Sequence, residues 1–133
     1  MSKGLALHWR LIPQRYNLIG TECVTCKTKF FPKRSICPNC RRRSKIREIK
    51  YSGRGKVYSY TVIHAPPDGF ELLKPYVLAI IKLEEGPLVT AQIADADPDE
   101  VDVGSKVELV FRKISSEGSD GIIKYGYKFK LRR

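Results

Sequence analysis

"CVTCKTKFFPKRSICPNC", residues 23–40, holds all four cysteines of this 133-residue chain. They form two Cys-x-x-Cys pairs, Cys23 with Cys26 and Cys37 with Cys40, on either side of a ten-residue spacer. A Cys-x-x-Cys turn places two sulfurs on one side of a metal ion, and two such turns supply the four thiolates that structural zinc prefers. The spacing therefore predicts a zinc ribbon with one Zn²⁺ ion and a tight hairpin through the spacer.

Other chemistry for these cysteines fits the pattern less well. A redox dithiol of the thioredoxin type has one pair at the start of a helix beside a βαβ unit. Both pairs here lie in loop-like surroundings. Four thiolate ligands also leave no open coordination position for water or substrate, so we expect a structural site without a catalytic role.

The rest of the sequence offers no catalytic constellation. His8 and His64 are its two histidines and lie far apart, so each is expected to be structural or on the surface. There is no Gly-rich phosphate loop, nucleophile elbow or paired metal-binding histidine motif. The acidic run from Asp95 to Asp102 does not match an EF-hand loop and is predicted to be a solvated loop. We therefore expect a protein that is not an enzyme.

Hydropathy indicates a packed chain outside the membrane. Hydrophobic residues make up 42% of the sequence, enough for a core. The longest apolar run, Val77 to Ile81, is far too short to cross a bilayer. The N-terminus lacks the apolar stretch and cleavage site of a signal peptide. These features predict a cytoplasmic location, where paired cysteines favour metal or redox chemistry over disulfides.

Three segments are predicted along the chain. Residues 1–20 mix apolar and polar positions around Pro13, which predicts a short helix followed by a second turn or helix. Residues 21–50 form the zinc ribbon. Two glycines in "YSGRGKVYSY" (51–60) mark the joint to a third segment, residues 51–133, which has the pattern of β-strands.

Five strand-like stretches lie in this third segment, at residues 56–64, 76–85, 88–94, 106–113 and 122–133. In the last three stretches, alternation places on one face Val89, Ala91, Ile93, Val107, Leu109, Phe111, Ile123, Tyr125, Tyr127, Phe129 and Leu131. On the opposite face of the last stretch it places Lys124, Lys128 and Lys130. Five strands without room for helical crossovers predict a small closed barrel of the OB type, with an open sandwich as the alternative. The fold class is mainly β: a helical segment, a zinc ribbon and a five-stranded OB-fold.

The net charge of +11 is concentrated around the cysteines. Between Lys27 and Lys56 there are twelve basic residues and one acid, Glu48, while the other positions cancel. The twelve are Lys27, Lys29, Lys33, Arg34, Arg41, Arg42, Arg43, Lys45, Arg47, Lys50, Arg54 and Lys56. Such a positive surface suits phosphate groups or an acidic protein partner.

Five longer stretches of sequence follow one another in an order that is typical of a known family. They are "WRLIPQRYNLIG" (9–20), the cysteine segment (23–40), "SGRGKVYSYTVI" (52–63), "PYVLAIIKLEEGP" (75–87) and "VDVGSKVELVF" (101–111). Together they resemble the DUF35 family, whose members join a helical segment and a rubredoxin-like zinc ribbon to an OB-fold. One departure is that Lys27 and Arg41 follow the second cysteine of each pair, where zinc knuckles often carry glycine.

The resemblance also implies a function. Members of the family are associated with acyl-CoA metabolism and partner with thiolase-type enzymes. Archaeal-looking members resemble the small subunit that bridges acetoacetyl-CoA thiolase and hydroxymethylglutaryl-CoA synthase in the mevalonate route. This implies a scaffold without chemistry of its own, in a complex with both enzymes and near bound acyl-CoA or CoA.

Two functional hypotheses use the same positive surface. In the scaffold, an acidic enzyme surface or the phosphates of CoA would contact Lys33, Arg34, Arg41, Arg42 and Arg43. In the alternative, an RNA- or single-stranded-nucleic-acid-binding protein, these residues would bind phosphates and Tyr58 or Tyr60 would stack on bases. Composition alone does not separate the two hypotheses.

Overall fold

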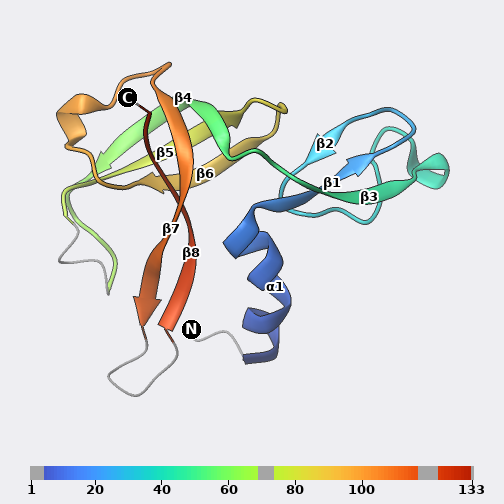
Figure 1. The fold of residues 1–133 in the computed structure, drawn as a ribbon, viewed down its shortest axis with the longest axis horizontal. Coiled ribbons are helices and arrows are strands. Elements are labelled where there is room, and N and C mark those ends of the chain that lie inside the picture. The colour runs from blue at the N-terminus through green and yellow to red at the C-terminus, as the bar shows by residue number, and fades with distance from the viewer. Residues whose placement is uncertain (1–4, 69–73, 117–122, 133) are drawn as a thin grey trace.

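The computed structural model describes residues 5–68, 74–116 and 123–132 (Figure 1). Its elements are α1 (Leu5–Asn17), β1 (Ile19–Cys23), β2 (Lys29–Phe30), the 3₁₀ helix η1 (Arg41–Arg43), β3 (Ile46–Lys50), β4 (Arg54–Ile63), β5 (Tyr76–Leu83), β6 (Leu88–Ile93), the 3₁₀ helix η3 (Pro98–Glu100), β7 (Lys106–Ser116) and β8 (Ile123–Leu131). A helix, a small ribbon sheet and a barrel follow one another along the chain, which confirms the predicted fold class.

Helix α1 runs without a break through Pro13. The prediction that Pro13 separates two short elements is therefore wrong. A proline inside a helix removes one backbone hydrogen bond and crowds the carbonyl four residues earlier, here that of Trp9. Both residues are exposed, so water can bind the freed carbonyl. The helix ends where Leu18, which is fully buried, adopts a left-handed φ of 52°.

The ribbon contains a three-stranded antiparallel sheet in the order β2-β1-β3. β1 pairs with β3 along its whole length, from Ile19 opposite Lys50 to Cys23 opposite Ile46. Within the described residues, the spacer between the cysteine pairs forms no hairpin of its own, so that prediction is wrong. Its strand β2 instead pairs with β1, on the side opposite β3. This pairing gives the backbone N–H and C=O groups of the spacer hydrogen-bond partners.

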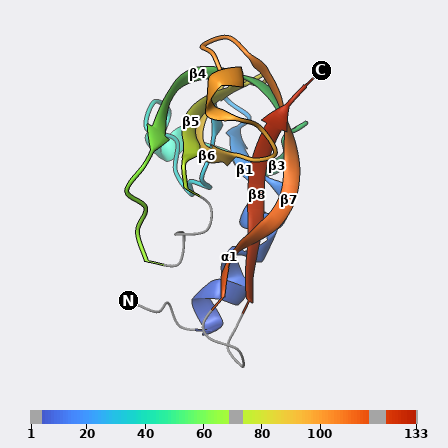
Figure 2. The same cartoon turned by 90° about the vertical axis from the view of Figure 1, so that its left-hand side faces the viewer.

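The barrel is closed, with the strand order β4-β5-β6-β8-β7 (Figure 2). This confirms the predicted five-stranded OB-fold over the open sandwich. The alternating residues of β6 are buried as expected, and so are Val107 of β7 and Phe129 of β8. The core is built from Leu18, Tyr51, Val57, Val77, Ala79, Ile81, Leu83, Val89, Ala91, Ile93, Val101, Val107 and Phe129.

An aromatic cluster joins the ribbon to the barrel. The Tyr51 ring is buried between them, and its hydroxyl donates a hydrogen bond to the Phe30 carbonyl at 2.7 Å. The Phe31 ring packs edge-on against Tyr51 at 6.3 Å and against Tyr127 at 5.6 Å between ring centroids. Gly20 allows this approach, because a Cβ there would lie 2.6 Å from the Tyr51 ring. The position of the ribbon on the barrel therefore depends on a few aromatic side chains.

The hairpin of β7 and β8 extends past the barrel and lies beside α1 (Figures 1 and 2). β7 pairs with β4 only over Lys106–Glu108, while its pairing with β8 continues to Ser116 opposite Ile123. In this extension the apolar face no longer meets the barrel core. It meets α1 instead, where the Tyr16 ring packs edge-on against Phe111 at 5.0 Å.

The extension explains why the apolar alternation of β7 and β8 does not all enter the core. Phe111, Ile123 and Tyr125 are 49%, 45% and 37% exposed, respectively. Phe111 and Tyr125 stack on each other, with ring centroids 5.3 Å apart. Conversely, Lys128, on the face predicted for the lysines, is buried, with 6% of its surface exposed. The alternation is present, but apolar residues of β7 and β8 are buried in the core only where these strands belong to the barrel.

Candidate metal centre and charged surfaces

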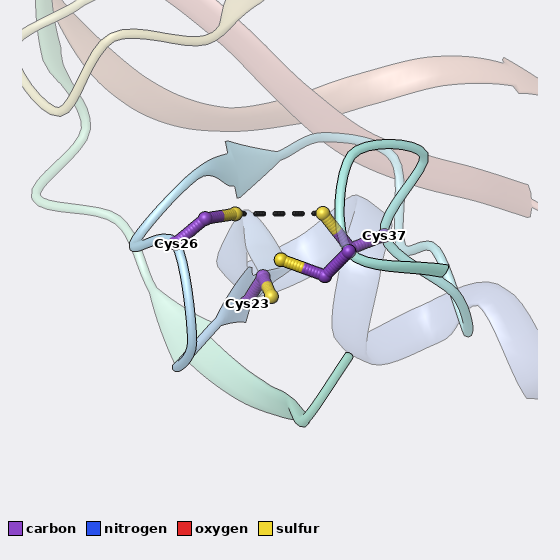
Figure 3. A group of neighbouring side chains, drawn as sticks. Cys23, Cys26 and Cys37 are labelled. Carbon is purple, nitrogen blue, oxygen red and sulfur yellow. Dashed lines mark hydrogen bonds between the residues drawn. The ribbon is translucent and has the colours of Figure 1, made fainter. Parts of the chain in front are cut away.

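The four cysteine sulfurs lie together in the ribbon. The Sγ atoms of Cys23, Cys26, Cys37 and Cys40 all lie within 4.8 Å of one another. The sulfurs of Cys26 and Cys37 lie 3.5 Å apart, and a dashed line joins them in Figure 3. Four thiolates around zinc, at a Zn–S distance of about 2.3 Å, lie about 3.8 Å apart in a tetrahedron. The geometry is therefore consistent with one structural zinc ion.

Two turns of the same shape position the sulfurs. In the first, the backbone N–H of Lys27 donates to the Cys23 carbonyl at 2.7 Å. In the second, the N–H of Arg41 donates to the Cys37 carbonyl at 2.8 Å. Lys27 and Arg41 adopt the left-handed φ values, 60° and 48°, that glycine favours. The missing glycines therefore do not change the knuckle geometry, although each non-glycine residue costs about 1 kcal/mol there.

The surroundings of the sulfurs change their acidity in different directions. A hydrogen bond from the Cys26 backbone N–H lowers the pKa of Cys23 to about 6. The Thr28 side chain lowers the pKa of Cys26 through a hydrogen bond of 3.2 Å between Sγ and Oγ1. The neighbouring Cys26 sulfur, together with burial, raises the pKa of Cys40 to about 12. Four thiolates this close repel one another, and a bound divalent cation would compensate their charge.

Among the residues that the structure describes, these four cysteines are the group of His, Cys, Asp and Glu side chains with metal-binding geometry. Cys23 and Cys37 are buried, whereas Cys26 is exposed. A site closed by four sulfurs has no position for a reacting molecule. Its chemistry is therefore that of a structural centre.

The arginines predicted as contact residues are held directly beside this centre. Arg41, Arg42 and Arg43 form η1 immediately after Cys40, and all three side chains are exposed. The Thr25 hydroxyl donates to the Arg43 carbonyl at 3.0 Å, which ties η1 to the first cysteine turn. Folding of the cysteine turns therefore determines how this arginine cluster is presented.

Lys33 and Arg34 are placed by other parts of the ribbon. The Lys33 ammonium forms an ion pair of 2.8 Å with Glu48 on β3, so its charge is already compensated. Arg34 is exposed, its backbone N–H donates to Thr21 on β1, and its guanidinium lies 5.3 Å from the Phe30 ring centroid. Of this pair, Arg34 is the one whose guanidinium has no carboxylate partner within the described residues.

The barrel carries a second cationic cluster, which sequence reasoning missed. Lys56 lies directly opposite Lys82 on one side and Lys106 on the other, so three lysines form a row across three strands. The row lines a hollow of about 450 Å³ together with Arg54 and Arg132. Their spacing in the sequence gives no sign of this cluster, because only the strand register brings them together.

The histidines and tyrosines occupy separate positions. His8 is buried, and its Nδ1 has no hydrogen-bond partner among the described residues. His64 is exposed after β4. Tyr58 and Tyr60 on β4 are 59% and 37% exposed. Within the described part of the chain, neither histidine is hydrogen-bonded to a nucleophile.

A four-cysteine ribbon joined to an OB barrel defines a class of two-module proteins, and comparisons with known proteins identify the family. Residues 12–45 match the family described as "ChsH2, rubredoxin-like zinc ribbon domain", and residues 48–112 match "ChsH2, C-terminal OB-fold domain".

Across the described parts of the chain, no helix has the length and apolar character needed to span a bilayer.

Two curated relatives are similar over nearly the whole chain. A "DUF35 domain-containing scaffold protein" of Methanothermobacter thermautotrophicus is 57% identical over 92% of this chain and 92% of its own. A protein of the same name from Methanocaldococcus jannaschii is 56% identical over 96% of this chain and 91% of its own. The chain therefore belongs to the DUF35 family.

A solved structure shares the arrangement of the modules. The chain is similar to one titled "Ltp2-ChsH2(DUF35) aldolase", with a TM-score of 0.70 and 28% identity. The match covers 98% of this chain and 96% of the other. The zinc ribbon and OB-fold are thus combined here as in another DUF35 protein.

Proposed function

We propose that this protein is a cytoplasmic, non-catalytic scaffold that holds an acetoacetyl-CoA thiolase and a hydroxymethylglutaryl-CoA synthase together in the mevalonate pathway. Curated relatives of this chain are named DUF35 scaffold proteins, which supports this role. The resemblance that suggests the two enzymes rests on the sequence stretches described above. In this proposal residues 1–20, 21–50 and 51–133 are the helical segment, the ribbon and the OB-fold.

The distribution of charge is the observation that carries the proposal. Residues 1–50 contain thirteen basic and two acidic residues, whereas residues 51–133 contain twelve of each. The ribbon presents the exposed arginines of η1, while the barrel combines its lysine row with the exposed acidic loop between β6 and β7. Surfaces of such different charge suit two different protein partners, since complementary charge selects a partner and its orientation.

The zinc ion would maintain the first of these surfaces. Cys23, Cys26, Cys37 and Cys40 are proposed as its ligands, and the arginines of η1 continue directly from the last of them. Metal binding supplies folding free energy to small modules of this kind. The ion therefore has a structural effect on partner binding and takes no part in a reaction.

The benefit of such a scaffold is proximity. An acetoacetyl-CoA released by the first enzyme would meet the second at a high effective concentration. This matters because thiolase condensation is thermodynamically unfavourable and needs a following step to remove its product. The positive surface also suits the phosphates of a CoA thioester passing between the enzymes.

The proposal is tested by size-exclusion chromatography of the three purified proteins at moderate salt. We expect one complex that contains all three. The variant R41Q/R42Q/R43Q should lose one enzyme and keep the other. The matched control K56Q/K82Q/K106Q removes the same charge from the barrel and should keep the enzyme that the first variant loses.

An RNA- or single-strand-binding role is the second candidate, favoured by the exposure of Tyr58. An exposed tyrosine beside cationic strands can stack on a base. If the three proteins elute separately while the chain retains labelled RNA or single-stranded DNA, the scaffold proposal fails and this candidate replaces it.

A further inference from the structure

The lysine row on the outer face of the barrel continues into an apolar residue. Lys106 on β7, Lys56 on β4 and Lys82 on β5 lie directly opposite one another in neighbouring strands. The next residue in the same row is Leu88 on β6, directly opposite Lys82. All four side chains are exposed, and Leu88 has 48% of its surface in solvent. Three cations and one apolar side chain therefore form a line across four strands.

The three lysines form no ion pair and no side-chain hydrogen bond among the described residues. Lys130 on β8, by contrast, is paired with Glu108 at 3.3 Å. Arg54 and Arg132 add two more cations to the hollow of about 450 Å³ beside the row, and Glu84 is the acidic residue among its described lining residues. The described part of this surface is therefore strongly positive and open to an acidic partner.

The arrangement of the lysines opposes the stability of the barrel. Like charges directly opposite each other on neighbouring strands repel. An exposed strand position accepts many other polar residues, and threonine would suit the strand without this repulsion. Residues that depart from the stable choice are expected where a protein has a functional surface. The lysine row therefore indicates a binding function.

The spacing of the row suits a helix. Neighbouring strands lie about 4.8 Å apart, so the three steps from β7 to β6 span about 14 Å. Successive turns of an α-helix are about 5.4 Å apart, so three turns span about 16 Å. Same-face side chains of an extended strand are about 6.7 Å apart, and three such intervals span about 20 Å. A helix that lies across the strands therefore matches the row better than an extended segment does.

We propose that the lysine row and Leu88 dock an acidic helix of a protein partner. Carboxylates at helix positions i, i+4 and i+7 would face the three lysines, and an apolar residue at i+11 would face Leu88. The leucine at the end of the row favours a protein over a nucleic-acid backbone, whose phosphates would contact only the cations. The inference rests on the proposed function only in requiring a protein partner.

A second copy of this chain does not supply such a helix. Its α1 (Leu5–Asn17) contains no aspartate or glutamate, and it carries Arg10 and Arg15. The acidic loop between β6 and β7 contains only the short 3₁₀ helix η3 (Pro98–Glu100), which is less than two turns long. The helix must therefore come from a different protein.

The test uses the full-length, zinc-loaded, ¹⁵N-labelled protein and a synthetic alanine-based helical peptide. The peptide carries glutamates at positions i, i+4 and i+7 and leucine at i+11. Saturable changes in amide chemical shift are expected at Lys56, Lys82 and Leu88. Because the probe is a peptide, the result is independent of whether the two enzymes assemble on this protein.

Three variants locate the binding. K56Q/K82Q/K106Q should weaken peptide binding about tenfold or more, because three charge pairs are lost. The matched control R41Q/R42Q/R43Q removes the same charge from the ribbon and should bind the peptide within about twofold of the parent. Leu88→Ala, which leaves every charge in place, should weaken binding about threefold through loss of apolar contact.

Several results would overturn the proposal. Equal binding of a peptide of the same composition in scrambled order would show that only net charge is recognised. Unchanged binding in K56Q/K82Q/K106Q would show that the peptide binds elsewhere. The proposal is also wrong if labelled single-stranded DNA shifts the amides of the row while the peptide does not.

A folding control accompanies the triple variant. K56Q/K82Q/K106Q should unfold at the same denaturant concentration as the parent or at a higher one, since it removes facing like charges. Should it fail to fold, Lys56→Gln at the centre of the row gives the test, and unchanged peptide binding in that variant would overturn the proposal.

Discussion

The ribbon and the barrel of this protein are stabilised in different ways. The barrel encloses a continuous apolar core to which all five of its strands contribute. The ribbon buries few apolar side chains, and its centre is a cluster of four cysteines. Small modules that lack a sufficient core depend on a metal or on disulfides for their fold. The comparison therefore predicts that one chain contains a metal-dependent module and a metal-independent module.

Loss of zinc should have the largest effect and should be confined to the ribbon. Structural zinc contributes about 10–16 kcal/mol in isolated zinc-finger peptides. Cys37→Ser should therefore expose the amides of residues 21–50 to rapid hydrogen exchange, while the barrel strands keep their protection. Ser35→Ala, in the same spacer, is the control and should exchange like the parent. Elemental analysis that finds no stoichiometric metal in freshly purified protein would contradict this prediction.

A core truncation should have the converse effect. Phe129 is fully buried and lies at the single pairing position between β6 and β8. Phe129→Ala should lower the free energy of unfolding of the barrel by about 3–5 kcal/mol, as for other large aromatic truncations. Ile123→Ala, on the exposed part of the same strand, should change it by about 0.5 kcal/mol or less. Chemical denaturation measures both, and equal losses would show that the hairpin extension is packed as tightly as the core.

The joint between the modules should show a smaller effect with a clear pH dependence. Burial raises the pKa of Tyr51 to about 12, from an ordinary value of 10.0. Because the phenol ionises less readily in the folded state, its contribution to stability is complete below pH 10 and is lost as the pH rises towards 12. Tyr51→Phe should cost about 1 kcal/mol at neutral pH, through loss of the hydrogen bond to Phe30.

Denaturation at several pH values tests this assignment. The stability of the parent should fall more steeply above pH 10 than that of Tyr51→Phe. Tyr58→Phe, at an exposed tyrosine of β4, should follow the parent. A parallel decline in Tyr51→Phe and the parent would mean that ionisation of another group weakens the joint.

The lysine row should show the smallest effect, and it should be an increase. Like charges directly opposite each other on neighbouring strands are unfavourable. Lys56 faces both Lys82 and Lys106, so Lys56→Thr should stabilise the barrel by about 0.2–1 kcal/mol. Lys113→Thr, opposite Tyr125 on the hairpin extension, is the matched control without facing lysines. Destabilisation by Lys56→Thr alone would indicate that the lysine stems contribute more by packing than their charges cost.

The two modules also differ in how much of their structure could be predicted from the sequence. The cysteine centre could be predicted because its ligands are local in the chain and their spacing fixes the turns. Even Lys27 and Arg41 adopt the conformation for which knuckles usually use glycine, since the turn hydrogen bonds require it. The alternation in β6 likewise identified core positions, because that strand lies wholly within the barrel.

What the sequence could not reveal depends on tertiary structure. Alternation marks the faces of β7 and β8 but not the point at which the hairpin leaves the barrel. Phe111 therefore contacts α1 rather than the core, and Lys128 is buried despite its polar pattern. The same limit applies to the lysine row, which only strand register assembles. Pro13 shows a further limit. The rule that a proline interrupts a helix did not predict that α1 continues through Pro13 on its solvent-exposed side.

The most direct test of the scaffold proposal is to measure the binding of each purified enzyme separately to the parent protein and to Cys37→Ser. If each module holds one enzyme, a variant with an unfolded ribbon and an intact barrel should lose one of them. It should bind the other enzyme with unchanged affinity. Binding of neither enzyme by the parent, or retention of both by a variant whose ribbon is shown to be unfolded, would contradict the proposal.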